Sequence, residues 1–346
     1  MNLEGYSATG PREANEDNYF VIDFSDYGTF TNGVCALAVV SDGMGGYLGG
    51  DIASGIVISE AERYMDQLLE MAKGNHIEFD APTALDEIVQ NAHAIILEEA
   101  EKNDGRSMGA TFVGAFISPT HAWIGHVGDS RAYLIHDGEA TQLTEDHSQV
   151  GRMLSRGLIS EEEAQNHPDR NKIEQALGFT VLETEIDEVD FEPGDSLVLC
   201  SDGVYTVVNY EKLANCVQKS RDAESAALNA VNAALSAHTD DNSTAVVVFP
   251  DRPAPYKKRA GDTMPGTIIP GTVQAVPSTA PTTRMEPAPV NINTTRPRPS
   301  QAGSTGRRPS HTHATEDSAN RRGFLIPLLI GAGLLFCILG LLTCSL

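Results

Sequence analysis

Basic side chains are scarce in the first 250 residues of this 346-residue chain. That stretch holds 13 Lys and Arg against 43 Asp and Glu, which leaves a net charge of −30. Non-specific nucleic-acid binding requires basic side chains along the phosphate backbone, so this composition argues against a nucleic-acid partner. An acidic folded region instead favours a cation in its cleft.

Closely spaced cysteine pairs are missing as well. No two of the five cysteines have C-x-x-C spacing; they are Cys35, Cys200, Cys216, Cys337 and Cys344. The three unpaired thiols in the acidic part indicate a reducing compartment. The polar N-terminus lacks the apolar run of a secretory signal, so we expect none there.

A long apolar run is present near the C-terminus, from residue 324 to 342. As a helix it is long enough to cross a hydrocarbon core of about 30 Å. Arg321 and Arg322 precede it, and the positive-inside tendency then places the folded part in the cytoplasm. We therefore expect residues 323–346 to form a C-terminal transmembrane helix, a single-pass anchor in the cell membrane. The alternative, a buried core helix, fits less well because a long polar stretch precedes the run.

Residues 251–322 differ in composition from the acidic part. They are rich in Pro, Thr, Ser, Gly and Arg and hold 11 basic against 5 acidic side chains. Such a composition buries too little apolar surface to fold, so it predicts a disordered linker. The threonines of the linker are candidate phosphorylation sites, with a passive tether as the default interpretation.

Strand-like and helical patterns alternate through residues 1–250, which we expect to form one domain. Apolar runs typical of strands occupy residues 34–41, 110–118, 121–127, 131–136, 196–201 and 243–249. Apolar residues recur at helical spacing in 51–73, 83–101 and 222–238. Strand pairs followed by helices predict an α+β sandwich rather than a regular βαβ repeat.

Carboxylates recur where these apolar runs meet a turn. Three aspartates end such runs, a fourth precedes one, and a Glu-Asp pair follows an arginine near the N-terminus. They are Asp42, Asp129, Asp202, Asp241, Glu16 and Asp17. If they converged in space they would repel one another, and a divalent cation would remove that repulsion. Ligation by oxygen alone suits Mg²⁺ or Mn²⁺.

A pair of such ions would supply a definite chemistry. Two metals about 3.5–4 Å apart can hold a water between them and lower its pKa, giving a hydroxide nucleophile near neutral pH. Phosphate esters are typical substrates, and an arginine binds their non-bridging oxygens bidentately. Arg12 lies four residues before Glu16 and is the candidate. Gly43, next to Asp42, allows a close approach by the backbone, so that a carbonyl can also ligate.

Seven short motifs follow one another along the chain. They are Arg12-x-x-Asn15-Glu16-Asp17, Ser41-Asp42-Gly43-Met44-Gly45-Gly46, Met108-Gly109-Ala110-Thr111, Gly128-Asp129-Ser130-Arg131, Leu143-Thr144-Glu145-Asp146-His147-Ser148, Ser201-Asp202-Gly203 and Asp241-Asn242-Ser243-Thr244. In this order the set resembles the metal-dependent Ser/Thr protein phosphatases of type 2C, the PPM family, in its compact bacterial form. The resemblance spans about residues 5–249. Each motif alone would mark only a turn, and the resemblance is specific because all seven occur in this order.

The resemblance implies both a fold and an activity. The fold is two antiparallel β-sheets packed as a central sandwich and flanked by pairs of helices. The activity is hydrolysis of phosphoserine and phosphothreonine on proteins with two Mn²⁺ or Mg²⁺ ions and a weaker third ion. The hydroxide between the two ions attacks phosphorus in line, without a covalent phosphoenzyme.

Roles for four acidic or backbone groups come with the resemblance. Asp42 bridges the two ions, and the Gly43 carbonyl adds to one of them. Asp202 and Asp241 complete the shell of one ion. No side chain can be named as the general acid, because Met44 stands where eukaryotic members carry a histidine proposed to protonate the leaving oxygen.

The same resemblance assigns the remaining charged positions. Glu16 and Asp17 serve the other ion, partly through water, and Arg12 holds the phosphate. Asp129 supports the third ion. Two of these positions also have plain structural interpretations, Asp17 as a helix N-cap and Asp129 as a turn former. Arg131 is either functional or one half of a structural ion pair.

The resemblance also implies residues that support the metal ligands and a mobile segment beside the site. Thr111 and Ser130 resemble positions that support the backbone around the ligands, and Asn242 is expected to fix the turn that presents Asp241. Residues 150–178 resemble the flap that contacts protein substrates; the alternative is an ordinary surface hairpin of helices. Ser160 and Glu163 predict a capping box within it.

The expected partners are phosphorylated proteins, first of all a membrane Ser/Thr kinase and its substrates. Confinement to the same membrane raises their effective concentration without new contacts. Two alternatives stay open from the sequence. One is a non-catalytic phosphoprotein-binding module on the same fold, and the other is a phosphatase dedicated to a single regulator, such as an anti-sigma antagonist.

Overall fold

The computed structural model describes residues 1–251, apart from 46–48, 74, 104–106, 171 and 181. The described residues belong to one compact unit. The boundary predicted at residue 250 stays a prediction, and the predicted transmembrane helix and nearly all of the predicted linker lie outside the described residues. Within the described part of the chain, every helix is too short or too polar to cross a membrane.

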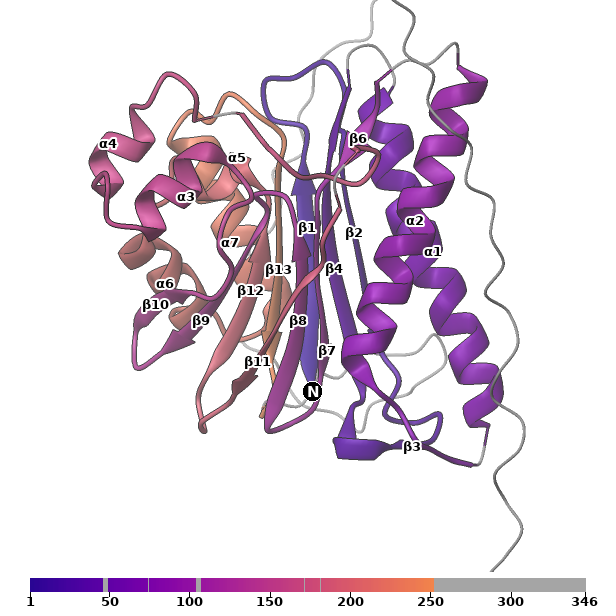
Figure 1. Ribbon diagram of the computed structural model, residues 1–346. Helices are drawn as coiled ribbons and strands as arrows, with labels where there is room; N and C mark the ends of the chain where they lie inside the picture. Colours follow the sequence, from indigo (N-terminus) through magenta and orange to yellow (C-terminus); the bar gives the residue numbers. More distant parts are fainter. Residues whose placement is uncertain (46–48, 74, 104–106, 171, 181, 252–346) are drawn as a thin grey trace, which may run out of the picture. The chain divides into compact units, whose positions relative to one another are not determined.

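Two antiparallel sheets form the centre of this unit (Figure 1). The first has the strand order β1 (Asn2–Ala8), β13 (Ser243–Phe249), β12 (Ser196–Cys200), β9 (Arg131–His136) and β10 (Glu139–Gln142). The second has the order β11 (Glu185–Asp190), β8 (His121–Val127), β7 (Phe112–Ile117), β4 (Ala36–Met44) and β2 (Asp17–Asp23), with β6 (Gly109–Ala110) paired to the end of β4. A short parallel pair, β3 (Thr29–Phe30) and β5 (His76–Ile77), lies apart from both.

Alternation along β4 shows how the layers are built. Successive side chains of a strand point to opposite faces. Ala38 and Val40 join the core between the two sheets, whereas Leu37 and Val39 join the core beneath the neighbouring helices. Because both faces are buried, the strand is an uninterrupted apolar run and could be recognised in the sequence.

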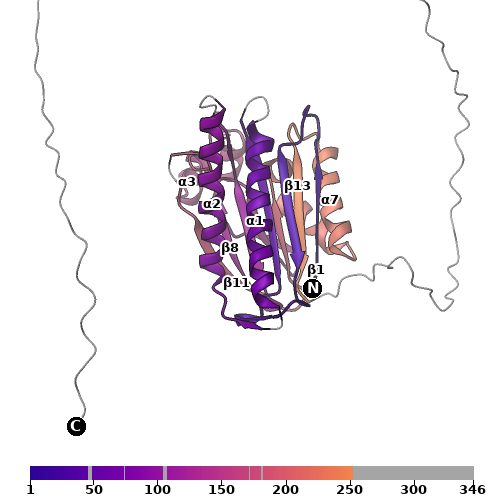
Figure 2. The same cartoon turned by 90° about the vertical axis from the view of Figure 1, so that its right-hand side faces the viewer.

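Helices cover the outer face of each sheet (Figures 1 and 2). The long helices α1 (Gly49–Ala72) and α2 (Ala81–Lys102) pack on β4, β7 and β8. On the other sheet lie α6 (Tyr210–Gln218) and α7 (Ala223–Ser236), and the alanines of α7 allow it to pack closely against β1 and β13. The predicted sandwich of two antiparallel sheets flanked by helix pairs is therefore confirmed.

Shorter elements lie around one end of the sandwich. They are α3 (Gln149–Ser155), α4 (Glu161–Gln165) and α5 (Asp202–Tyr205), whereas a 3₁₀ turn (Thr31–Gly33) follows β3 at the other end (Figure 1). Ser160 and Glu163 form the predicted capping box at the start of α4. The segment with α3 and α4 returns to the core where Ala110 bridges Leu177, so the predicted flap is attached to the sandwich at its base.

Candidate active site

Strand direction brings the predicted carboxylates to one edge of the sandwich. β2 begins at Asp17 and β4 ends near Asp42, and these two residues are directly opposed in the antiparallel pair. β12 ends just before Asp202, and β13 begins just after Asp241. Asp129 lies in the turn between β8 and β9. Residues far apart in the sequence thus meet at the ends of six strands.

The electrostatics of Asp42 and Asp202 show that the carboxylates crowd one another. Burial, followed by the charges of Asp17 and Asp202, raises the pKa of Asp42 well above its ordinary value. Burial, followed by the charges of Asp129 and Asp241, raises the pKa of Asp202 in the same way. The cluster is therefore a concentrated negative site with too few cationic side chains to neutralise it.

Asp17 is the most enclosed of these acids, with 4% of its surface exposed. The hydroxyls of Ser201 and Thr244 both donate to its Oδ2 at 2.7 Å. These hydrogen bonds favour the ionised form, yet burial dominates and raises the pKa of Asp17 to about 6. The structure thus holds the carboxyl in one orientation by a side chain just after β12 and one in β13, and Asp17 is at the start of β2 and is not a helix N-cap.

Asp129 is also buried, and its pKa is raised to about 7 by burial and then by the charge of Asp146. The Tyr205 side chain hydrogen-bonds to this carboxyl. Burial raises the pKa of Glu16 and of Asp241 as well. All six predicted carboxylates therefore share an environment that disfavours their charged forms.

A divalent cation fits this set of groups. Asp202 Oδ1 is buried and has no hydrogen-bond partner in the described part of the chain, as expected of an oxygen placed to ligate an ion. The donors are carboxylate oxygens and backbone, the ligands that Mg²⁺ and Mn²⁺ prefer. The residues able to hold the ions are Glu16, Asp17, Asp42, Gly43, Asp129, Asp202 and Asp241.

Close backbone packing explains two glycines of the site. A Cβ on Gly43 would lie 2.1 Å from the Gly50 carbonyl oxygen, so only glycine lets the first turn of α1 pack on the end of β4. A Cβ on Gly203 would lie 1.8 Å from the Asn242 oxygen. The close approach of Gly203 to the Asn242 carbonyl brings the start of α5, with Asp202, against the segment that carries Asp241.

Arg12 lies at the rim of the cluster. Its Nη2 donates to Asp241 Oδ2 at 2.5 Å and its Nε donates to the Asp240 carbonyl at 2.8 Å. A guanidinium has five N–H donors, so three stay available for a phosphate. The side chain is 51% exposed, which makes it accessible to a substrate.

Thr111 and Ser130 form hydrogen bonds around the Asp42 backbone. The Asp42 N–H donates to Thr111 Oγ1 at 2.9 Å, and the Thr111 N–H donates to the Asp42 carbonyl at 2.8 Å. The Thr111 hydroxyl is in turn 2.7 Å from Ser130 Oγ. These buried contacts connect the end of β4 to the turn after β8, and so join Asp42 to the Asp129 turn.

Asn242 does more than the sequence indicated. Its Oδ1 accepts from the Glu16 N–H at 2.9 Å, and its Nδ2 donates to the carbonyls of Thr9 and Ala14 at 2.7 and 2.9 Å. The residue therefore attaches the whole loop that carries Arg12 and Glu16 to the start of β13. A single asparagine in the sequence gave no signal of a contact to residues more than 220 positions away.

Arg131 is half of a structural ion pair. Its Nε and Nη2 donate to the two oxygens of Asp146 at 2.7 Å each, and its guanidinium lies 3.6 Å from the centre of the Tyr205 ring. Tyr205 and Asp51 are site residues that sequence analysis missed, and Asp146 was named there only as part of a motif, without a role of its own. Asp51 adds to the charge around Glu16, but at the start of α1 it looks like an ordinary helix-terminal acid.

Two histidines near the site are structural. His126 Nε2 is 2.8 Å from the Glu145 carbonyl, and His147 Nδ1 accepts from the Gly128 N–H at 3.2 Å. With Glu185 they have the spacing of a metal site. However, Nδ1 of neutral His147 accepts a hydrogen bond, so its proton is on Nε2, which faces Glu185 and cannot ligate. The ring instead fixes the turn that precedes Asp129.

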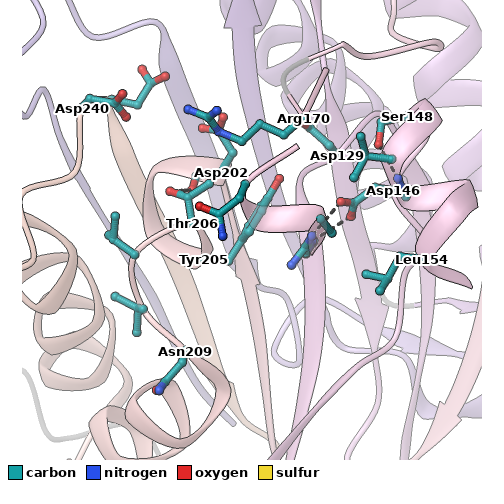
Figure 3. Close-up of a pocket in the computed structure, with 18 of the residues that line it drawn as sticks. Asp129, Asp146, Ser148, Leu154, Arg170, Asp202, Tyr205, Thr206, Asn209 and Asp240 are labelled. Carbon is teal, nitrogen blue, oxygen red and sulfur yellow. Dashed lines mark hydrogen bonds and ion pairs between the residues drawn. The ribbon is translucent and has the colours of Figure 1, made fainter. Parts of the chain in front are cut away.

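A cavity of about 570 Å³ opens beside the carboxylates (Figure 3). Arg12, Asp129, Asp202 and Asp241 line one part of it, and residues of the flap and of the α5–α6 region line much of the rest, together with Arg131 and Tyr133. Figure 3 shows the Arg170 side chain extending across it toward the side on which Asp202 lies. The predicted flap therefore forms one wall of the cavity at the acidic cluster.

Comparison with known proteins agrees with this geometry. Residues 5–238 match the family model described as Protein phosphatase 2C. A serine/threonine phosphatase, stp, of Listeria monocytogenes serotype 4b is 32% identical over 241 residues, which cover 69% of this chain and 92% of the relative.

Solved structures of bacterial phosphatases share the fold. The crystal structure of the Mycobacterium tuberculosis serine/threonine phosphatase PstP/Ppp superposes with a TM-score of 0.60 at 29% identity, covering 71% of this chain and 98% of that one. The PstP catalytic domain, in complex with two manganese ions, gives 0.59 at 28% identity, covering 71% and 96%. On the family match, the motifs and the fold together, this chain belongs to the protein phosphatase 2C family of serine/threonine phosphatases.

Proposed function

We propose that this chain hydrolyses phosphoserine and phosphothreonine on proteins with Mn²⁺ or Mg²⁺ as cofactors, two ions at the main site and a third near Asp129. The convergence of six carboxylates, with Asp202 Oδ1 buried and unpaired, carries the proposal. Asp42 occupies the middle of the cluster and would contact both ions. Asp202 and Asp241 would complete one shell, and Glu16 and Asp17 would serve the other.

The chain's own residues bind and orient the substrate. Bound divalent ions supply a water of lowered pKa and neutralise phosphate charge. The free N–H groups of Arg12 bind the non-bridging oxygens of the phosphate. The hydrogen bond of Arg12 to Asp241 fixes the position of the guanidinium relative to the carboxylates. Thr111 holds the Asp42 backbone, which would keep this carboxylate in place to hold the ions.

Metal-dependent release of phosphate from a phosphothreonine peptide by the full-length chain tests the proposal. We expect activity with Mn²⁺ that chelation removes, and a loss of more than about 100-fold in Asp42→Ala and Asp202→Ala. Asp66→Asn, an exposed aspartate of α1, is the matched control. Wild-type activity in both cluster variants would overturn the assignment, and tight peptide binding without phosphate release would favour a non-catalytic module.

We further propose that the chain is held at the cell membrane by residues 323–346, with the catalytic domain in the cytoplasm, where it opposes a membrane Ser/Thr kinase. The apolar run from 324 to 342 and the preceding Arg321 and Arg322 support this proposal. Membrane fractionation of the full chain and of a chain that stops at residue 322 tests it. Equal solubility of the two would contradict anchoring, and unchanged phosphorylation of membrane kinases without the gene would contradict the partner.

A further inference from the structure

The cavity beside the carboxylates is larger than a phosphate group requires, and part of its lining is apolar. Its volume of about 570 Å³ lies within the range of about 300–1,000 Å³ typical of sites that enclose whole ligands. Away from the carboxylates, apolar side chains from the flap and from the α5–α6 region line it, alongside the polar side chains of Ser148, Asn166 and Asn209. We define this apolar lobe as Val150, Leu154, Ala164, Val207, Val208 and Tyr210.

The two ends of the cavity differ in chemistry. In Figure 3, Asp240 and Asp202 lie toward the left, and Leu154 lies at the lower right, below Asp146. Arg170 lines the same cavity and forms no ion pair with any residue that the structure describes, so its charge is available to a phosphorylated ligand. With cations bound at the carboxylates, the phosphate of a substrate is favoured beside Arg12 and Arg170, and an apolar part of the substrate in the lobe.

The lobe is built from two separate walls. Val150 and Leu154 belong to α3 in the flap, whereas Val207 and Val208 follow α5. Leu154 and Val207 are only partly buried, and Val208 is 3% exposed. A side chain that enters between the walls would cover apolar surface on both, which is the ordinary source of selectivity for an aliphatic group.

We propose that the apolar lobe is a specificity subsite that takes a large aliphatic side chain of the substrate polypeptide close to the phosphorylated residue. The inference rests on the proposed phosphatase function, since the lobe is continuous with the site that would hold the phosphate. A volume of about 570 Å³ corresponds to a width of roughly 8 Å, which an extended chain crosses in two or three residues. The recognised side chain therefore lies within three positions of the phosphothreonine.

A positional scan of peptides tests the subsite. A single leucine is placed in turn at each of the three positions before and after phosphothreonine in an otherwise alanine and glycine peptide, and phosphate release by the full-length chain is measured with Mn²⁺. We expect kcat/KM to be about tenfold higher than for the all-alanine peptide at one or two positions. A flat profile across all six positions would overturn the proposal.

Variants of the two walls show whether the lobe causes the preference. Leu154→Ser and Val207→Ser should each reduce the ratio of leucine to alanine peptide rates toward one. Leu158→Ser is the matched control, because Leu158 lies just after α3, is 67% exposed and does not line the cavity. A preference that persists in both wall variants would also overturn the subsite.

The failure of the phosphatase function itself would look different. p-Nitrophenyl phosphate needs no lobe, so its hydrolysis reports on the catalytic centre alone. If this small ester is hydrolysed and all peptides are hydrolysed at the same rate as one another, only the subsite would be contradicted. No hydrolysis of either substrate with Mn²⁺ would contradict the proposed function, and the subsite with it.

Discussion

Asp17 and Asp42 are directly opposed across β2 and β4, and their carboxyls lie close enough to share a hydrogen bond. Two acids in this position cannot both ionise without cost unless a cation joins them. The hydrogen bonds from Ser201 and Thr244 hold Asp17 toward this contact. The sandwich thus brings together side chains whose repulsion would otherwise destabilise it.

This relationship predicts how stability depends on pH without metal. The pKa of Asp17 is raised to about 6 and that of Asp129 to about 7, from ordinary values near 3.9. Between about pH 4 and 7 the folded protein therefore holds more protons than the unfolded chain, and the free energy of unfolding must fall as pH rises. Ionisation of Asp17 alone corresponds to a loss of about 3 kcal/mol.

Urea unfolding in chelating buffer at pH 5 and pH 8 measures this effect. The free energy of unfolding should be lower at pH 8, and Asp17→Asn should reduce the difference, because the amide does not titrate. Asp66→Asn should leave the difference unchanged, since that carboxylate is exposed. If Asp17→Asn shows the same difference between pH 5 and pH 8 as the unsubstituted chain, this carboxyl does not titrate as the structure indicates.

Metal binding should stabilise the folded chain through the same carboxylates. Mn²⁺ at 100 times its dissociation constant adds about 2.7 kcal/mol if it binds only the folded state. Asp202→Asn should raise the melting temperature in chelator, because it removes a buried charge, yet lose most of the increase caused by Mn²⁺. Thermal scans with and without MnCl₂ test both parts, and an undiminished Mn²⁺ effect in this variant would exclude Asp202 as a ligand.

Arg12→Lys should impair substrate binding through geometry rather than charge. A lysine keeps the positive charge but loses the planar fork that contacts Asp241, the Asp240 carbonyl and a phosphate together. We expect kcat/KM for a phosphothreonine peptide to fall about tenfold, mainly through KM. Arg221→Lys, at a side chain 91% exposed, should have no effect; equal kinetics for the two variants would show that Arg12 does not bind the phosphate.

Thr111→Val should disturb Asp42 without touching any ligand. The valine cannot accept the hydrogen bond from the Asp42 N–H or form one with Ser130. The buried Asp42 N–H then loses its partner. We expect a loss of about 1–3 kcal/mol in the free energy of unfolding and a higher Mn²⁺ requirement. Thr111→Ser keeps the hydroxyl and should restore the Mn²⁺ requirement; a valine variant with a normal requirement would contradict this role.

The sequence predicted the parts of the fold that are buried on both faces. β4 and β13 are continuous apolar runs and were recognised, whereas β11 was not, because its residues alternate between acidic and apolar at a sheet edge. β2 carries Asp17 but was missed because its residues are mostly half-buried and mixed in polarity. Strand assignment from sequence thus depended on how completely each strand is enclosed.

The candidate site was predicted as a set of carboxylates but not as a network of contacts. Ordered motifs indicated Asp42, Asp202 and Asp241, since each stands at the end of a recognisable strand. The links made by Asn242, and the ring of Tyr205 against Arg131, depend on segments far apart in the chain. No local pattern encodes such pairs, so they required the three-dimensional structure.

The central claim is that these acids converge to hold a pair of divalent ions. Anomalous diffraction from crystals of the protein grown with Mn²⁺ tests it most directly. The account predicts two manganese peaks in contact with Asp42, flanked by Asp202 and Asp241 on one side and by Glu16 and Asp17 on the other. Well-ordered crystals whose carboxylate cluster shows no anomalous peak at saturating Mn²⁺ would contradict it.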